Sequence, residues 1–135
     1  MSGDAEFDFR DMQAQGEAAG VQVLYLLTMA PLPVAGPQPA VSSALEAHYA
    51  YMHRIIADGR VLAIGPCMNE TASPGHAPVP PGFGILAVGS REEAEQIAED
   101  EPFHTMGWRR NTVMAWTPKF GSLIEVLRGV PRPGE

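Results

Sequence analysis

The sequence lacks the features of a secreted or membrane-spanning protein. Its single cysteine, Cys67, excludes an internal disulfide. The longest apolar run, residues 23–27, is far shorter than a bilayer span, and Pro31 and Pro33 follow it closely. The first ten residues have no basic stretch followed by an apolar one, so they do not resemble a signal peptide. We therefore expect a cytoplasmic protein with no membrane partner.

Positive charge is also scarce. Nine Lys and Arg residues stand against 16 Asp and Glu residues, which gives a net charge of -7. The basic residues do not gather beyond Arg109–Arg110 and the pair Arg128 and Arg132. Such a chain repels a phosphate backbone, so we expect no nucleic-acid partner. Four scattered histidines and one cysteine lack the spacing of a zinc site, and no phosphate-binding loop is present. We expect neither a metal nor another cofactor.

The composition that remains is that of an ordinary globular protein. The 135 residues are 45% hydrophobic and 19% charged, which suffices for one domain with a buried core. Residues 1–20 are acidic and contain three glycines, so we expect a solvated leader that is partly disordered. The folded domain is predicted at residues 21–120, followed by a C-terminal tail at 121–135.

The hydrophobic pattern predicts four strands. Residues 21–29 are almost entirely apolar, as in a strand covered on both faces. Prolines and glycines then interrupt the chain before the next periodic segment. The other predicted elements are strands at 61–64, 83–88 and 111–117, a long loop at 69–82, one helical turn within 103–108 and a short helix at 122–127.

Two longer helices complete the prediction. The first begins at a serine, at 42 or 43, and Ser43 with Glu46 fits a capping box. Its apolar residues recur with helical spacing up to the Asp-Gly sequence at 58–59. Ser90 and Glu93 form a second candidate capping box. That helix must end near residue 100, because the residue before Pro102 avoids helical angles.

The resulting order, β-α-β-β-α-β, is that of the α+β ferredoxin-like fold. Both helices of that fold lie on one face of the sheet. The predicted strand at 21–29 is nevertheless apolar on both faces. A second copy of the chain would cover the open face, so we expect a homodimer.

His48 is the first candidate for chemistry. It lies on the apolar stripe of the first helix, between Leu45 and Met52, so its ring points into the core or into a pocket. A neighbouring carboxylate can tune a buried imidazole for acid–base work near neutral pH. A core histidine bonded to a backbone carbonyl would show the same pattern.

Glu101 is the candidate partner. Helical spacing from Ala94 through Ala98 brings it onto the inward face of the second helix. A carboxylate there needs a cation or donor, and His48 is a candidate donor. The alternative is that Glu101 belongs to an acidic, solvated run, in which Asp100 competes for the same role.

Several short stretches occur as an ordered set along the chain. They are His48 in LEAHYAYM, Gly59, Gly65-Pro66 in AIGPCM, Ala94 in SREEAEQI, and Glu101-Pro102-Phe103 followed by Gly107. In these residues the sequence resembles the YCII-related domain family, over about residues 21–116. This resemblance implies a ferredoxin-like dimeric α+β barrel with an active site that pairs a histidine with an aspartate. It also implies lyase-like chemistry, because the activity assigned within the family is elimination of HCl from a chlorinated aromatic compound.

Carried over by position, the family's histidine is His48 and its acid is Glu101. The family usually has Asp directly before the proline, so Glu101 is a departure. Three alternatives follow: the longer side chain of Glu101 still reaches His48, Asp100 takes the place of Glu101, or the histidine–acid pair is lost.

Three further residues are candidates for substrate contact. Cys67 follows Gly65-Pro66 and would line a pocket there, although a free cysteine is more often a small buried hydrophobe. Arg109 could bind an anionic substrate group, although a strand-edge arginine often serves only solubility. Trp108 is predicted to pack in the core or to form a wall of the pocket.

Three functions fit these residues. The first is a cofactor-independent lyase or isomerase that acts on a small molecule, with His48 as general base and acid and Glu101 as the group that orients it. The second is a dimeric module that binds a small ligand without turning it over. The third is a protein that docks partners through the acidic leader or the proline-rich loop.

Overall fold

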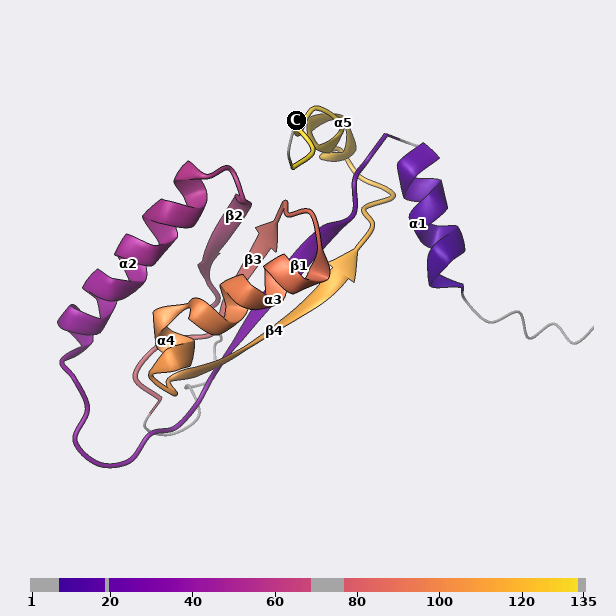
Figure 1. The fold of residues 1–135 in the computed structure, drawn as a ribbon. Helices are drawn as coiled ribbons and strands as arrows, with labels where there is room; N and C mark the ends of the chain where they lie inside the picture. The colour runs from indigo at the N-terminus through magenta and orange to yellow at the C-terminus, as the bar shows by residue number, and fades with distance from the viewer. Residues whose placement is uncertain (1–7, 19, 69–76, 134–135) are drawn as a thin grey trace, which may run out of the picture.

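The structure, a computed structural model, describes residues 8–18, 20–68 and 77–133. Four strands form one antiparallel sheet in the order β2-β3-β1-β4 (Figure 1). Central β1 pairs with both neighbours at Leu27, which lies opposite Gly84 and Val113. This order confirms the ferredoxin-like α+β fold. The strands are β1 (Leu24–Pro31), β2 (Val61–Pro66), β3 (Gly82–Leu86) and β4 (Arg109–Trp116).

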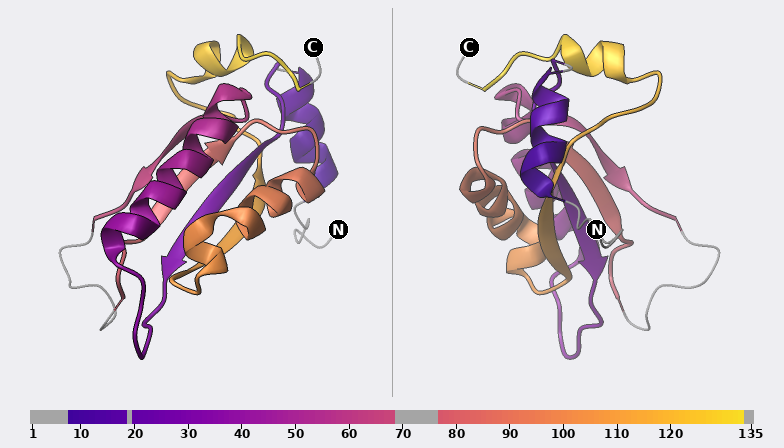
Figure 2. Two further views of the ribbon diagram at one scale, coloured as in Figure 1. Left: turned by 60° about the vertical axis from the view of Figure 1, so that its left-hand side comes forward. Right: turned by 90° about the vertical axis from the view of Figure 1, so that its right-hand side faces the viewer.

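Three helices cover one face of this sheet. Figure 2 shows α2 (Val41–Ala57), α3 (Arg91–Asp100) and the short α4 (Pro102–Thr105) together on that side. Two others, α1 (Phe9–Ala18) and α5 (Ile124–Arg128), lie beyond the end of the sheet where β1 begins and β4 ends. None of the described helices is long and apolar enough to cross a membrane.

The core lies between the sheet and the helices α2, α3 and α4. Leu27 and Met29 of β1 are buried against Met52 and Ile55 of α2 and against Ile97 of α3. Burying one such side chain stabilises the fold by about 1.5–3 kcal/mol. A smaller apolar cluster contains Ala44, Val79, Phe103 and Trp108. It extends the packed interior from α2 to α4.

The other face of the sheet is apolar and partly open. Leu26 pairs with Ile85 and with Met114, so these three side chains share that face. The side chains of Met114 and Phe83 are 55% and 39% exposed. The predicted two-sided apolar character of the first strand is therefore present, while the homodimer stays a prediction.

The two predicted capping boxes have different outcomes. The Ser90 hydroxyl accepts a hydrogen bond from the Glu93 N–H at 3.1 Å, which confirms Ser90 as the N-cap of α3. The Ser43 prediction is wrong, because α2 begins at Val41 with Ala40 as its N-cap and no side-chain cap. Residue 43 therefore lies inside the first turn, where its hydroxyl cannot serve a boundary N–H.

Two other segments differ from expectation. Helix α1 occupies residues 9–18, part of the segment predicted as an acidic leader with partial disorder. Of the long loop predicted at 69–82, residues 69–76 lie outside the described residues, and β3 already begins at Gly82. The remaining strands lie within a few residues of their predicted ranges.

Candidate active site

His48 lies on the inner side of α2, one turn before Met52. Its ring stacks on Phe103 of α4, with ring centroids 4.3 Å apart and an interplanar angle of 11°. Its Nδ1 atom is 2.6 Å from Oε1 of Glu101. The His48 side chain is 14% exposed, whereas that of Glu101 is completely buried. The structure therefore joins the two residues that the sequence analysis proposed as a pair.

Pro102 explains why Glu101 adopts this position. The residue before a proline avoids helical angles, and Glu101 has extended φ and ψ of -64° and 127°. It ends α3 and is the N-cap of α4, where its Oε2 accepts a hydrogen bond from the His104 N–H at 3.1 Å. The kink between the two helices therefore turns the carboxylate inward, towards α2.

Asn111 of β4 completes the surroundings of the carboxylate. Its amide nitrogen donates to Glu101 Oε2 at 3.0 Å and to the Ala98 carbonyl at 3.0 Å. Burial raises the pKa of Glu101, but the hydrogen bonds from His48 and Asn111 outweigh burial and hold that pKa below its ordinary value. Glu101 is therefore ionised at neutral pH and can only accept hydrogen bonds.

The ionised carboxylate determines the state of the imidazole. Because Glu101 Oε1 only accepts, the Nδ1–H group of His48 must donate to it. In the neutral ring the proton is then on Nδ1, and Nε2 keeps its lone pair. No hydrogen bond to Nε2 is made by the residues that the structure describes. This nitrogen is the atom that can accept a proton from a bound molecule.

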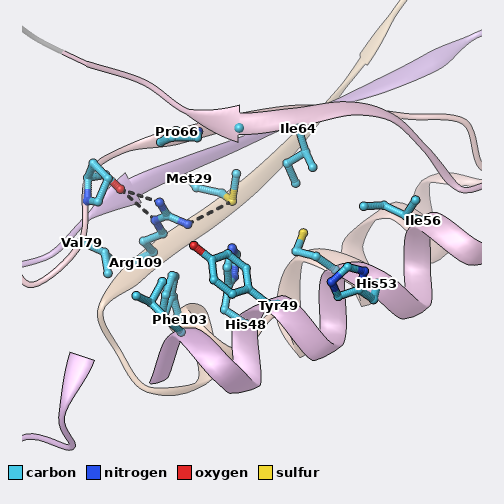
Figure 3. A pocket seen from close by; sticks show the side chains of 14 residues that line it. Met29, His48, Tyr49, His53, Ile56, Ile64, Pro66, Val79, Phe103 and Arg109 are labelled. Atoms are coloured by element: carbon cyan, nitrogen blue, oxygen red, sulfur yellow. Dashed lines mark hydrogen bonds between the residues drawn. The ribbon is translucent and has the colours of Figure 1, made fainter. Parts of the chain in front are cut away.

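The imidazole borders a cavity of about 370 Å³ between α2 and the sheet (Figure 3). A volume of this order suits a small molecule. The wall is mostly apolar, with a few polar groups among it, which is the usual composition of a small-molecule site. The lining residues are Met29, Leu45, His48, Tyr49, Met52, His53, Ile56, Ile64, Gly65, Pro66, Val79, Pro80, Phe103 and Arg109.

Arg109 enters the cavity from the first residue of β4. It is only 4% exposed, unlike the exposed strand-edge arginine that was the alternative. Its Nε and Nη2 atoms donate to the Pro80 carbonyl at 3.0 and 2.6 Å, and Nη1 donates to the Met29 sulfur at 3.7 Å. Its guanidinium carbon lies 5.0 Å from the centroid of the Phe103 ring. Burial lowers the pKa of Arg109 and the charge of Glu101 opposes this change, so the group remains a cation.

Residues 23–117 match the YCII-related domain. The chain belongs to the YCII-related domain family. A search of curated proteins returned no match.

Solved structures share the fold of this YCII-related domain. Among them is 5-chloro-2-hydroxyhydroquinone dehydrochlorinase from Burkholderia phenoliruptrix AC1100, in complex with 2,5-dihydroxybenzoquinone. The sequences are 21% identical, and the match covers 73% of this chain and 95% of that chain with a TM-score of 0.51. At this identity the likeness shows a common fold.

Three of the predicted site residues do not reach the cavity of this YCII-related domain. Asp100 is exposed on α3 and accepts a hydrogen bond from Gln96 at 2.9 Å, so it does not replace Glu101. Cys67 is exposed and lies outside the lining. Trp108 is completely buried behind Phe103, where its indole N–H donates to Gln38 at 3.0 Å, so it offers a ligand no surface.

Several residues that line the cavity carry no clear functional signal in the sequence. Tyr49 and His53 border the cavity from α2, and Val79 and Pro80 border it from the segment before β3. His53 comes five residues after His48, so helical spacing turns it away from that residue, and no sequence signal marks it as part of the lining. Among the described His, Cys, Asp and Glu residues, no group of three could hold a metal ion.

Proposed function

We propose that this YCII-related domain is a cofactor-independent enzyme of lyase or isomerase type that acts on a small molecule. His48 is its general base and then its general acid, and Glu101 orients the imidazole. The observation that carries this proposal is the 2.6 Å contact between Nδ1 of a cavity-lining histidine and a buried carboxylate. A base held by an ionised orienting group is the arrangement that proton abstraction needs.

The chemical step begins at Nε2 of His48, whose lone pair can accept a proton. Nε2 of His48 takes a proton from an acidic C–H or O–H group, and Glu101 stabilises the imidazolium that forms. The electron pair left on the substrate then moves into a neighbouring bond. In an isomerisation the imidazolium returns the proton to another substrate atom, and in an elimination a leaving group departs with its own electron pair. General acid–base catalysis of this kind contributes about 10²–10⁴-fold to a rate.

The similar structure supports the elimination branch. That protein is a dehydrochlorinase, so it removes HCl from a chlorinated hydroquinone. The same step here would transfer the proton to His48 while chloride leaves. We therefore propose small oxygenated ring compounds as the first substrates to test.

The alternative function is a module that binds a ligand without turning it over. Such a module would suit an unpaired His48, because an imidazole without a carboxylate partner is a poor base but an adequate ligand contact. The hydrogen bond to Glu101 favours the enzyme, because a purely binding histidine has no need of a buried, ionised partner.

Proton abstraction can be tested before the natural substrate is identified. Candidate compounds are incubated with the protein in D₂O, and exchange of their carbon-bound acidic hydrogens is followed by NMR. Release of chloride from 5-chloro-2-hydroxyhydroquinone is measured in parallel. The proposal predicts catalysis by the wild type and its loss in His48→Gln, with a smaller loss in His53→Gln, whose imidazole has no carboxylate partner among the described residues.

Two outcomes of that experiment would reject acid–base catalysis. One is a His48→Gln variant as active as the wild type. The other is a set of compounds that bind, as shown by a thermal shift, but do not exchange hydrogen or lose chloride, which would favour the binding module.

We also propose that the protein is a homodimer built on the open face of the sheet. The support is the set of apolar side chains on that face, among them Phe83 and Met114. An apolar face of this kind is stabilised when a second copy covers it.

A further inference from the structure

Arg109 is a buried cation that faces the cavity. Its guanidinium has no carboxylate within ion-pair distance among the residues that the structure describes. The carboxylate whose charge it feels, Glu101, already accepts hydrogen bonds from His48, His104 and Asn111. A buried, uncompensated charge is costly to the fold, so its presence beside a cavity calls for an explanation.

Only some of the N–H donors of Arg109 have an acceptor among the described residues. A guanidinium carries five N–H groups. Three of them donate to the Pro80 carbonyl and the Met29 sulfur, which are neutral acceptors. Within the described residues, one N–H on each terminal nitrogen has no acceptor. Two terminal N–H groups are suited to bind a carboxylate or another anionic oxygen.

Arg109 also has a defined relation to the proposed base. Phe103 contacts both groups: the His48 ring lies 4.3 Å from its centroid and the Arg109 guanidinium 5.0 Å. Both groups line the same cavity, as Figure 3 shows. A molecule of single-ring size can therefore touch Nε2 of His48 and the guanidinium at once.

We infer that Arg109 is the binding group for an anionic oxygen of the substrate, so that the cavity takes small, single-ring carboxylates or phenolates. This inference rests on the proposed function for the role of His48 and adds the charge of the substrate. The bound anion supplies a counter-ion that no described residue provides, and Arg109 holds it while His48 reaches a proton elsewhere on the ring. The apolar wall, which includes Met52 and Ile64, then contacts the body of the ring.

Matched ligands test the charge preference. Benzoate and benzamide have nearly the same shape but differ in charge, and 4-nitrophenolate with 4-nitroanisole gives the same comparison for a phenolate. Binding to the wild-type protein is measured by calorimetry, at a pH above the pKa of 4-nitrophenol. The inference predicts that at least one anion binds about tenfold or more tightly than its neutral counterpart. Equal affinity within both pairs would overturn it.

Variants then assign the preference to Arg109. Arg109→Met should reduce the affinity ratio to about one, and Arg109→Lys should keep part of it. The matched control is Arg110→Met, which removes an exposed cation from the next residue of β4 and should leave the ratio unchanged. If Arg109→Met does not fold, the Arg109→Lys ratio decides, because a ratio equal to that of the wild type would contradict bidentate binding by the guanidinium.

The inference and the proposed function fail in different ways. A protein that abstracts protons through His48 but shows no anion preference would refute the inference alone. A protein that prefers anions through Arg109 but never exchanges hydrogen would refute the proposed catalysis and leave the anion site standing. The His48→Gln variant should keep the ratio between benzoate and benzamide, because Arg109 is unaltered.

Discussion

Replacing Glu101 with glutamine should reverse the tautomer of His48. In the wild type, Oε2 accepts from His104 and Asn111, and Oε1 accepts from His48 Nδ1. A glutamine that keeps the first two hydrogen bonds must place its carbonyl oxygen at the Oε2 position. Its NH₂ group then takes the Oε1 position and donates towards Nδ1. The imidazole proton therefore moves to Nε2, and this nitrogen can no longer act as a base.

The expected cost to activity is much larger than the cost to stability. Loss of the correct tautomer removes the general base, which corresponds to about 10²–10⁴-fold in rate. Three hydrogen bonds that end on a charged carboxylate become hydrogen bonds to a neutral amide or are rearranged. The free-energy cost of burying the charge also disappears. The free energy of unfolding should therefore fall by only about 1–3 kcal/mol. For a chain of this length that is a decrease in Tm of about 3–15 °C.

NMR of the imidazole nitrogens measures the tautomer directly. The wild type should show a protonated Nδ1 and an unprotonated Nε2, and Glu101→Gln should show the reverse together with slow hydrogen exchange of the substrate. Asp100→Asn is the matched control, because it neutralises the neighbouring acid that lies away from the cavity. A Glu101→Gln variant with the wild-type tautomer and the wild-type rate would refute the reasoning.

Three other predictions concern stability and assembly. Folding lowers the pKa of Glu101 below 4.5, so the carboxylate's contribution to stability is complete above that pH and is lost as the pH falls through the folded pKa. The free energy of unfolding of Glu101→Gln should therefore depend less steeply on pH in acid than that of the wild type. An identical pH dependence of the two proteins would contradict the assignment. Ser90→Ala should lower the free energy of unfolding in urea by about 1 kcal/mol, whereas Ser43→Ala should stay within about 0.5 kcal/mol of the wild type. Met114→Glu should shift the protein from dimer to monomer in light scattering, while Val126→Glu on α5 should not; a wild-type monomer would reject the dimer.

Local sequence patterns account for most of the fold. The alternation of apolar runs with helical periodicity determined the order of strands and helices, and hence the ferredoxin-like topology. Ser90 marked the start of α3, because its hydroxyl bonds to an N–H only three residues away. The same pattern failed at Ser43, where the helix begins two residues earlier and Ala44 is buried in the smaller apolar cluster.

The candidate site could be predicted only in part from local sequence patterns. The spacing of α2 predicted that His48 faces inward, and Pro102 determined the extended backbone that ends α3 at Glu101. Sequence alone could not choose between Glu101 and Asp100, because both lie at the end of the same helix. Their environments differ only after α3 and α4 pack on the sheet, which buries Glu101 and leaves Asp100 in solvent.

Tertiary structure alone decided what surrounds the base. The hydrogen bond between His48 and Glu101 joins residues 53 positions apart, and the hydrogen bond between Arg109 and Pro80 joins residues 29 apart. No local pattern encodes such distances, since they depend on where helices and strands cross. The sequence by itself determined which strands and which sheet-covering helices form and in what order. The packing of α2, α4 and β4 determined that a base, its carboxylate and a buried arginine meet at one cavity.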